Sequence, residues 1–477
     1  MKRSQVMKDF ERMKDIASVY SQKKCWERAL RMLFFASGFM YYLNQKLYDT
    51  DLENLLEWIV KKNIKAGEYD VNEDVILFFD SFGRMDRGLT AIYIKALYQM
   101  GFKIVYVTHK KERTALSTES KYIYEKFYVE GRTYLQRIEC LAEIMKKVAA
   151  KRIFMYLLPD DIVAVGAFAL ADRETIRYQI NLTDHAFWLG RNISDIIINF
   201  REFGACVCKF NRDLPEERLR YLPYYPLDIL AKFEGLGKIE DKKYKIFSGG
   251  NLYKTYSRDN QYYDIVETIL KNNGDIGFIF CGDGNASRMR RLCRKYPEQF
   301  IYERERKDFY EIMKRCTVYF STYPYNGGLM TQYAILAKKV PVTLTCKGIE
   351  KELTIRDEEA FWNYSSREQC IYALEKLLYD EEYRNDKQNM LDQFLISEQE
   401  FRIGLSDIIF NGKSGWNIKY DRKDLSGLKE HPVWYYNWFR YSRLFFRRDG
   451  FFMVRYFPCK FIFGFLGRVS ERINHGK

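Results

Sequence analysis

The chain has 477 residues, 47% hydrophobic and 17% aromatic, which allows two or three domains with packed cores and excludes a disordered protein. Its net charge of +14 predicts an anionic partner: a nucleotide, an acidic polymer or an anionic membrane. Nucleic acid is not expected, because 78 Lys and Arg residues are interspersed with 64 Asp and Glu residues and no zinc-finger or RNA-recognition signature occurs.

The cysteines and the N-terminus indicate a cytoplasmic protein. Ten Cys residues are scattered along the chain, and no CxxC pair is present, so a structural zinc site is not expected. Met1 to Lys24 is too charged for a secretory signal. Free thiols without an export signal fit a reducing compartment.

Residues 1–66 are predicted to be helical. Apolar residues recur at helical spacing from Trp26 to Phe34 and again from Leu52 to Ile59, after a capping region at Asp49–Asp51. We expect a helical hairpin that packs on the main body. The alternative is an arm that binds a partner.

Residues 70–230 are predicted to form a first α/β domain, because apolar runs alternate with helical periodicity. Helix Leu89–Met100 should end at Gly101. The predicted strands are Val75–Phe79, Lys103–Thr108, Arg152–Leu157, Arg177–Leu182 and Asp195–Phe200. This alternation predicts a parallel, doubly wound sheet.

A second α/β domain is predicted over residues 243–415, after an exit turn at Leu222–Leu227 and a linker at Ala231–Lys243. Its predicted strands are Tyr244–Ser248, Ile276–Cys281, Phe300–Tyr302, Val318–Phe320 and Val340–Leu344. Its predicted helices are Gln261–Lys271, Ala286–Lys295, Lys307–Lys314 and Leu329–Ala337. Two such domains should face each other across a cleft.

Residues 421–477 change in composition, because aromatic residues there alternate with Arg and Lys. This pattern is typical of a segment that lies in a membrane interface. A C-terminal helix that returns to cover the cleft or the first domain is an equal alternative.

The stretch from Cys316 to Leu344 has the strongest functional pattern, because it predicts a strand, a glycine loop, a helix and a second strand. Gly327 and Gly328 would let the backbone approach a ligand, and the free N–H groups of the following helix suit a phosphate. The alternative is an ordinary strand-to-helix turn of any α/β domain.

Four other stretches are also expected at the carboxyl ends of strands, where ligands of α/β sheets bind. They are Gly83–Gly88, Thr183–Gly190, Ser248–Asn251 and Cys281–Asn285. All four could share one cleft with the glycine loop.

Candidate acid–base groups occur in two of these loops. His185 follows Asp184, a carboxylate that could orient its imidazole, and Asp86 is a weaker candidate. A histidine that only caps a helix is the alternative. Lys254 and Arg306 could neutralise a diphosphate. No Asp-x-Asp pair stands in a metal-binding context, so a metal-independent site is expected.

The motifs together resemble the GT-B glycosyltransferases. The resemblance is to bacterial members of the polysaccharide type and, more remotely, to protein O-linked N-acetylglucosamine transferases. It covers residues from about 70 to 345. The matching segments are Ile246–Gly250, Phe278–Gly284, Tyr323–Ala334 followed by Val340–Val342, and Thr183–Gly190.

The resemblance implies a nucleotide-sugar donor, expected to be UDP-linked, on the second domain and an acceptor on the first domain near Gly88 and His185. No other cofactor is implied. The diphosphate would lie against Asn326, Gly327, Gly328, Met330 and Thr331. The full predicted donor set adds Gly249, Gly250, Lys254, Gly282, Arg306, Tyr325 and Gln332.

One position departs from the family pattern. Many of these transferases carry Glu or Asp on the helix after the glycine loop, to hold the ribose, where this chain has Ala334. Gln332 could substitute, the ribose could be held elsewhere, or donor binding could have been lost.

The sequence therefore predicts an α/β chain of two Rossmann-like domains in the GT-B arrangement, with an N-terminal helical hairpin and a basic aromatic tail. The predicted function is transfer of a hexosyl or N-acetylhexosaminyl group to a glycan, lipid-linked or protein acceptor in surface glycan synthesis, at the inner membrane face. The alternatives are a non-catalytic transferase-like subunit that binds glycan or a partner enzyme, and a nucleotide-sugar epimerase.

Overall fold

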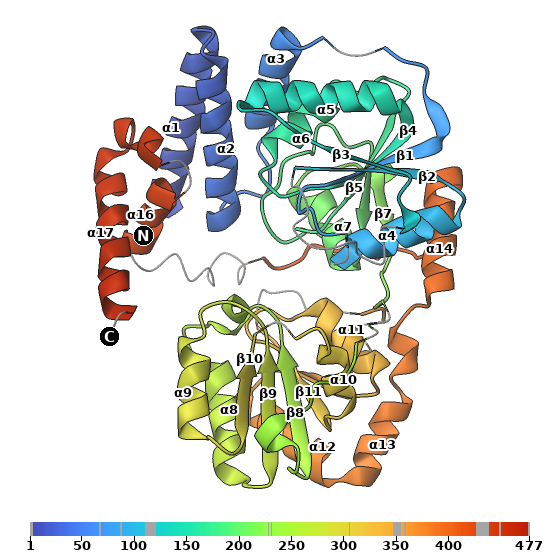
Figure 1. Cartoon of the computed structure of the whole chain (residues 1–477), viewed down its shortest axis with the longest axis vertical. Helices are drawn as coiled ribbons and strands as arrows, with labels where there is room; N and C mark the ends of the chain where they lie inside the picture. Colours follow the sequence, from blue (N-terminus) through green and yellow to red (C-terminus); the bar gives the residue numbers. More distant parts are fainter. Residues whose placement is uncertain are drawn as a thin grey trace. The chain divides into compact units, whose positions relative to one another are not determined.

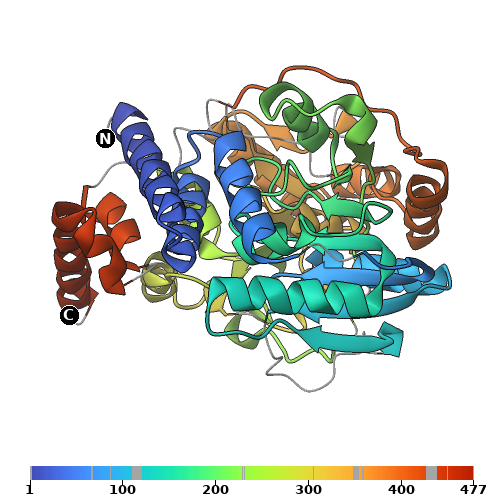
Figure 2. The same cartoon turned by 90° about the horizontal axis from the view of Figure 1, so that it is seen from above.

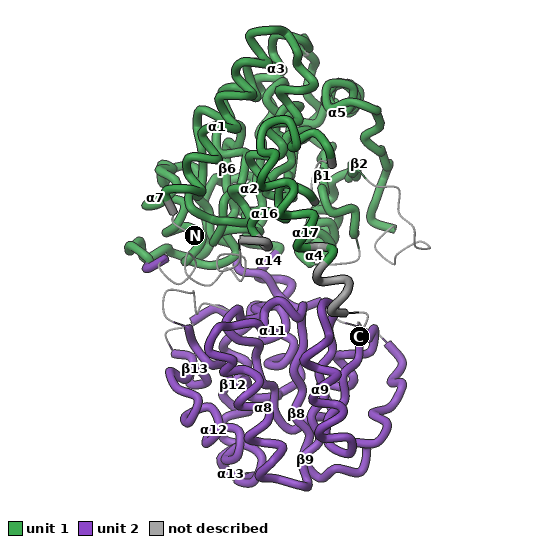
Figure 3. The backbone as a smooth tube through the Cα atoms, turned by 90° about the vertical axis from the view of Figure 1, so that its left-hand side faces the viewer, with its two compact units in different colours: residues 1–222, 402–423, 428–477 green, residues 223–401, 424–427 purple. Residues whose placement is uncertain are grey.

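The computed structural model describes residues 3–65, 68–85, 88–109, 121–227, 229, 231–304, 306–346, 354–356, 359–425, 438–447 and 450–475. The chain divides into two compact units, coloured separately in Figure 3. The first comprises residues 1–222, 402–423 and 428–477, and the second comprises residues 223–401 and 424–427.

The first unit contains a seven-stranded parallel sheet in the order β3-β2-β1-β4-β5-β6-β7 (Figure 1). Apolar runs form its centre; for example, the last six residues of β1 are all buried. The strands are β1 (Asn72–Asp80), β2 (Lys103–Thr108), β3 (Glu125–Tyr128), β4 (Ala150–Tyr156), β5 (Ile176–Ile180), β6 (Ile196–Asn199) and β7 (Leu219–Tyr221). The five predicted strands are present, and β3 and β7 were not predicted.

Helices α4, α5, α6 and α7 connect these strands. A capping box at Thr133 and Gln136 begins α5, and Ala149 in the left-handed conformation ends it. The bounds are α4 (Gly88–Gln99), α5 (Tyr134–Val148), α6 (Ile162–Phe168) and α7 (Glu202–Asn211).

The N-terminal segment forms three helices rather than the predicted hairpin: α1 (Arg3–Gln22), α2 (Trp26–Leu43) and α3 (Thr50–Asn63). The helix added to the predicted pair is α1, whereas α3 begins at the predicted cap, where Asp49 accepts a hydrogen bond from the Leu52 N–H. All three helices share one apolar core with the sheet and with the C-terminal helices.

The C-terminal tail returns to the first unit. Figures 1 and 2 show α16 (Trp438–Arg447) and α17 (Pro458–His475), in red, beside α1. A short helix, η9 (Gly450–Arg455), joins them. Buried Asp9 of α1 accepts hydrogen bonds from Tyr441 and Gln5 and pairs with Lys460. The tail therefore packs on the N-terminal helices of the first unit. This agrees with the predicted alternative in which a C-terminal helix returns to cover the first domain.

Residues 402–423 belong to the first unit, although the sequence assigned residues up to 415 to the second domain. The physical reason is a packed contact: Phe410 stacks on Phe102 with ring centroids 6.0 Å apart, and the Arg152 guanidinium lies 5.7 Å from each ring. Phe410 lies in the π-helical turn η7 (Asp407–Asn411), which follows α14 (Glu398–Ser406).

The second unit contains a six-stranded parallel sheet in the order β10-β9-β8-β11-β12-β13. Five of the strands were predicted, and β13 was not. The strands are β8 (Tyr244–Gly249), β9 (Ile276–Cys281), β10 (Phe300–Glu303), β11 (Val318–Phe320), β12 (Pro341–Leu344) and β13 (Asn363–Tyr364).

Six α-helices of the described part accompany this sheet. They are α8 (Gln261–Asn272), α9 (Ser287–Lys295), α10 (Phe309–Lys314), α11 (Gly328–Leu336), α12 (Arg367–Tyr379) and α13 (Glu381–Asn389). The first four agree with prediction to within about two residues. Short 3-10 turns complete the described chain: η2 (Glu216–Arg218), η3 (Gly237–Ile239), η4 (Leu252–Thr255) and η6 (Asp392–Phe394).

Candidate donor and acceptor sites

The candidate donor site lies where the strand order of the second sheet reverses. β8 is hydrogen-bonded to β9 on one side and to β11 on the other, so the chain winds outward in both directions from this point. Ligands of doubly wound sheets bind beyond the strand ends at such a reversal. Here those ends carry two of the predicted stretches, Ser248–Asn251 and the glycine loop Thr322–Gly328.

Three predicted glycines hold the ends of β8 and β9 together. The Gly250 N–H donates to the Cys281 carbonyl over 2.9 Å. A Cβ on Gly282 would lie 1.8 Å from the Gly250 oxygen, and one on Gly249 would lie 3.2 Å from the Met330 Cε atom. Only glycine at position 282 permits the close approach of the two loops. The Gly249 contact brings the β8 loop against the first turn of α11.

The loop before α11 is fixed by hydrogen bonds of its own side chains. Thr322 donates to the Tyr325 carbonyl over 2.7 Å, and Ser321 donates to the Asn326 side-chain oxygen over 3.5 Å. Tyr323 donates to Asp259 over 3.1 Å. Tyr325 and Asn326 are half-buried, so the loop presents them to the outside from a constrained backbone.

The first turn of α11 is half-buried, and residues Thr331–Ile335 after it are buried. Gly327 is its N-cap and supplies no side-chain hydrogen bond. The first bond within the helix runs from the Thr331 N–H to the Gly327 carbonyl, over 2.9 Å. The N–H groups of Gly328, Leu329 and Met330 therefore lack helical acceptors, and their dipoles favour an anion.

Two residues of α11 differ from expectation. Thr331, which was predicted to lie against the diphosphate, is fully buried, so its hydroxyl does not face solvent. Ala334 is also fully buried, within an apolar cluster that includes Phe247 and Tyr319. The position assigned to a ribose-binding acid thus faces the core. Gln332 is 4% exposed.

The two predicted cations differ in their surroundings. Lys254 is half-buried, and its carbonyl accepts from the Tyr325 N–H over 3.4 Å, which places its backbone beside the glycine loop. Arg306 instead makes a bidentate pair with Asp308 at 2.6 and 2.7 Å and donates to the Gly235 carbonyl. Because that pair already neutralises its charge, Arg306 is a poorer diphosphate ligand than predicted.

The candidate acceptor loop of the first unit follows β5. His185 Nδ1 lies 3.2 Å from the Asp184 carboxylate, as the sequence predicted, and the imidazole is 38% exposed. Arg201 donates to both oxygens of Asp184, at 2.5 and 2.7 Å. Burial raises the pKa of Asp184, but Arg201 and His185 outweigh it and hold that pKa well below its usual range. Asp184 is therefore a permanent anion that orients His185.

Residues distant in the sequence hold this loop in place. Buried Arg212 donates to the carbonyls of Thr183, Asp184 and Ala186. Asn44, which caps α2, donates to the His185 carbonyl over 3.0 Å and accepts from the Phe187 N–H over 3.1 Å. No local motif signals either partner, so sequence reasoning missed them.

Glu53 of α3 holds the end of the same loop. Its carboxylate accepts from the N–H groups of Gly190, Arg191 and Asn192 at 2.8 to 3.2 Å. Burial raises the pKa of Glu53 to about 7, against the opposing effect of these donors. The N-terminal helices thus position the loop that carries His185.

The other predicted residues of the first unit lie near β1 and β4. Gly88 begins α4 with a φ of 62°, and a Cβ there would meet the Tyr156 hydroxyl at 3.3 Å. Asp80 organises the preceding loop by accepting from the N–H groups of Phe82 and Arg84. Asp86 lies outside the described residues.

His109, which the sequence did not single out, lies at the strand reversal of the first sheet. Its Nε2 is 2.7 Å from Asp161, which also accepts from the Ser81 hydroxyl over 2.6 Å. Arg137 donates to its Nδ1 over 3.0 Å. Both ring nitrogens are thus engaged, which indicates a support for the Ser81 loop rather than a proton carrier.

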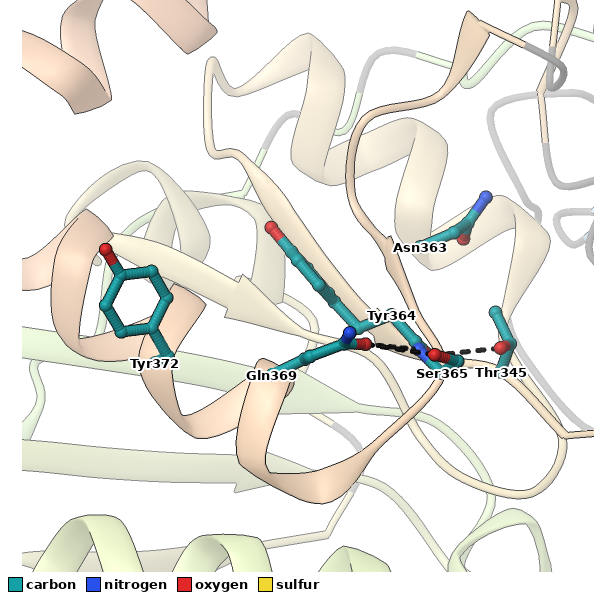
Figure 4. Close-up of a pocket in the computed structure, with 6 residues that line it drawn as sticks. All are labelled: Thr345, Asn363, Tyr364, Ser365, Gln369 and Tyr372. Atoms are coloured by element: carbon teal, nitrogen blue, oxygen red, sulfur yellow. Dashed lines mark hydrogen bonds between the residues drawn. The ribbon is translucent and has the colours of Figure 1, made fainter.

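A cavity of about 430 Å³ also opens beside β12, β13 and α12, as Figure 4 shows. Its polar lining is already used locally, because Gln369 accepts from Ser365 and Thr345 donates to the Tyr364 carbonyl. Its lining residues are Thr345, Asn363, Tyr364, Ser365, Gln369 and Tyr372. We assign it no role in the site.

No protein-family model and no curated protein sequence matches the chain. Among solved structures, a mutant of the O-GlcNAc transferase from Thermobaculum terrenum is similar, with a TM-score of 0.52 and 15% identity over 84% of this chain and 80% of that one. Anabaena HepE in complex with UDP and glucose has a TM-score of 0.52 and 10% identity, over 71% and 100% of the two chains.

A third solved structure, of a putative UDP-N-acetylglucosamine 2-epimerase from Listeria monocytogenes, has a TM-score of 0.50 and 8% identity, over 73% of this chain and 99% of that one. Together with two parallel, doubly wound sheets, these similarities show that the chain has the GT-B glycosyltransferase fold, which confirms the prediction. Among the described residues, no helix has the length and hydropathy needed to cross a membrane.

Proposed function

We propose that the chain is a glycosyltransferase that moves a sugar from a nucleotide-sugar donor to a glycan, lipid-linked or protein acceptor. The proposed donor is a UDP-linked hexose or N-acetylhexosamine. The proposed setting is surface glycan synthesis in the cytoplasm, with peripheral contact between the C-terminal segment and an anionic membrane. No metal ion is included in the proposed reaction.

One observation carries the donor assignment: the free amide end of α11 lies against the glycine-paired loops after β8 and β9. In that position the N–H groups of Gly328, Leu329 and Met330 would stabilise the negative charge of a leaving diphosphate. HepE, which has the same fold, binds UDP and glucose, and this supports UDP as the carrier.

The proposed chemistry is a substitution at the anomeric carbon. The acceptor hydroxyl oxygen forms a bond to that carbon, the bond to the diphosphate oxygen breaks, and the nucleoside diphosphate leaves with the electron pair. The hydroxyl proton passes to a base. His185 is the proposed base, because Asp184 orients its ring and part of the imidazole is exposed.

Two alternatives are kept, of which the first has a specific observation behind it. The Listeria neighbour supports a nucleotide-sugar epimerase, in which the sugar is changed without an acceptor. A transferase-like subunit that binds glycan or a partner enzyme without catalysis also fits the GT-B fold, because fold alone does not establish activity.

A thermal-shift screen of nucleotide sugars separates these functions. A donor that binds only the folded chain at a hundred times its Kd stabilises it by about 2.7 kcal/mol, so the correct donor should raise Tm. Mass spectrometry of the reaction mixture should then show a glycosylated acceptor. Isomerised nucleotide sugar in the absence of acceptor would favour the epimerase, and no response to any nucleotide sugar would favour the binding subunit.

The role of His185 is tested with the same assay. His185→Ala should abolish most transfer while leaving donor binding intact, since the donor is assigned to the other unit. His185→Gln serves as the control for shape, because it keeps a polar side chain without the titrating imidazole. Full transfer by either variant would remove His185 from the catalytic assignment.

A further inference from the structure

The outer face of α17 is apolar and exposed. Ile462, Phe465, Leu466 and Val469 are 40 to 54% exposed, and their spacing of three, four and seven residues places them on one side of the helix. Phe463 at the edge of this face is 39% exposed, and Phe451 of η9 is 84% exposed. We call these six residues the outer stripe.

The outer stripe is unusual for this chain. It contributes six of the eighteen large hydrophobic side chains that are exposed in the described part of the protein, within a span of nineteen residues. The other twelve are dispersed and include six Tyr and one Trp, whose polar atoms suit water. A contiguous aliphatic and Phe surface of this kind marks an interaction site.

The opposite face of α17 already has a partner, so the stripe is not needed for folding. Phe457 and Phe461 are buried, and Gly464 packs so closely on α16 that a Cβ there would lie 2.3 Å from the Ser442 carbonyl oxygen. The Lys460 ammonium turns inward to pair with Asp9. The helix is therefore apolar on both sides, but only the inner side is covered within the described structure.

Basic residues are frequent in the segment that carries the stripe. The sequence from 438 to 475 contains eight Arg and Lys residues but only two acidic residues, Asp449 and Glu471. Arg455, between Phe451 and α17, is exposed. Arg12 of the neighbouring α1 is also exposed, with its guanidinium 5.1 Å from the centre of the Phe457 ring. The segment therefore combines exposed apolar side chains with an excess of basic residues.

We propose that the outer stripe is the surface by which the chain binds an anionic lipid bilayer, with α17 lying in the plane of the membrane interface. The apolar side chains would enter the boundary between headgroups and acyl chains, and the surrounding Arg residues would contact lipid phosphates. The proposal rests on the membrane contact included in the proposed function and names its residues; it does not depend on sugar transfer.

Charge complementarity selects a lipid surface over a second copy of the chain. A partner copy would place the same cluster of positive charges opposite this one, which is unfavourable. An anionic bilayer instead supplies many phosphates and an apolar layer together, and each basic residue near the surface adds to binding.

The test is co-sedimentation of the full chain with vesicles. Vesicles of phosphatidylcholine alone are compared with vesicles of phosphatidylcholine mixed with phosphatidylglycerol. Binding should require the anionic lipid and weaken with added salt. Ile462→Ser should reduce partitioning on the order of fivefold, and Phe465→Ser with Leu466→Ser should reduce it more than tenfold.

Ile403→Ser is the matched control, because Ile403 is 52% exposed on α14 while Ile462 is 54% exposed on α17. It should leave partitioning unchanged. Thermal unfolding confirms that each variant is folded. Equal binding to neutral and anionic vesicles, or an equal loss in Ile403→Ser, would overturn the proposal. Self-association that Ile462→Ser abolishes would overturn it in favour of a second copy.

Nucleotide-sugar thermal shifts on the same variants separate this proposal from the proposed function. The shifts should not change in Ile462→Ser, because that residue belongs to the first unit and the donor loops belong to the second. Vesicle binding without any nucleotide-sugar response would refute sugar transfer alone. A nucleotide-sugar response without vesicle binding would refute the membrane surface alone.

Discussion

Gly282→Ala tests whether the contact between the β8 and β9 loops shapes the donor site. The added Cβ would lie 1.8 Å from the Gly250 carbonyl oxygen and 2.8 Å from its carbonyl carbon. Both atoms belong to the backbone, so no side-chain rotation relieves the clash. The Gly250 loop must move by more than about 1 Å to restore van der Waals contact.

The expected cost has two parts. Overpacking of this kind destabilises by about 1 to 3 kcal/mol, and loss of the hydrogen bond from Gly250 to the Cys281 carbonyl adds about 1 kcal/mol. For a unit of this size the total corresponds to a Tm lower by roughly 5 to 12 °C. Donor affinity should also fall, since the Gly249–Gly250 loop lies against Met330 of α11.

The assay is thermal unfolding with and without the stabilising nucleotide sugar. Gly274→Ala is the control: Gly274 lies in the turn before β9, a Cβ there meets no atom within 4 Å, and its φ is not in the left-handed region. It should unfold at or slightly above the wild-type temperature. If Gly282→Ala unfolds with the control and binds donor normally, the loop contact described for this site does not exist.

Three further substitutions test other features. Glu53→Gln should flatten the pH dependence of stability. Burial raises the pKa of Glu53 from 4.5 to about 7, so protonated Glu53 stabilises the wild type fully below pH 4.5, and about 3 kcal/mol of this stability is lost as the pH rises to 7. A difference in unfolding free energy between wild type and variant that stays constant across that range would contradict this. Asn44→Gly keeps the left-handed backbone but removes both hydrogen bonds to the His185 loop. The kcat for transfer should therefore fall about tenfold, while the thermal shift produced by the donor stays unchanged. An unchanged kcat would refute this positioning role. Ala334→Glu should lower Tm strongly and should not improve donor binding, because it buries a charge in an apolar cluster. Tighter donor binding by this variant would restore the assignment of position 334 to the donor ribose.

The sequence predicts the central elements well because their apolar runs are continuous. All six residues of β9 are buried, and both of its ends were predicted. The missed strands lie at or next to sheet edges and carry little signal. None of the four residues of β3 is buried, β7 has three residues and β13 has two. Periodicity cannot register segments of that length or exposure.

The candidate site is predictable only where its parts are local. Adjacent residues made the contact of Asp184 with His185 predictable, and glycine spacing indicated the loop before α11. The partners that fix these groups are not local. Arg201 is 17 residues from Asp184, and Asn44 is 141 residues from His185. Pairing over such separations follows from the fold and leaves no pattern in the sequence.

The two ends of the chain also hold each other in place. Asp9 of α1 is buried and takes hydrogen bonds from Gln5 and Tyr441, while it pairs with Lys460 of α17. Removing the tail would therefore take away two partners of this carboxylate and expose the apolar residues of the N-terminal helices that share a core with α16 and α17, at a cost of several kcal/mol. Because α2 and α3 of the same core hold the His185 loop, a truncation would disturb the proposed acceptor site together with the proposed membrane surface. Point substitutions on the outer stripe separate the two effects, and deletion of residues 438–477 does not.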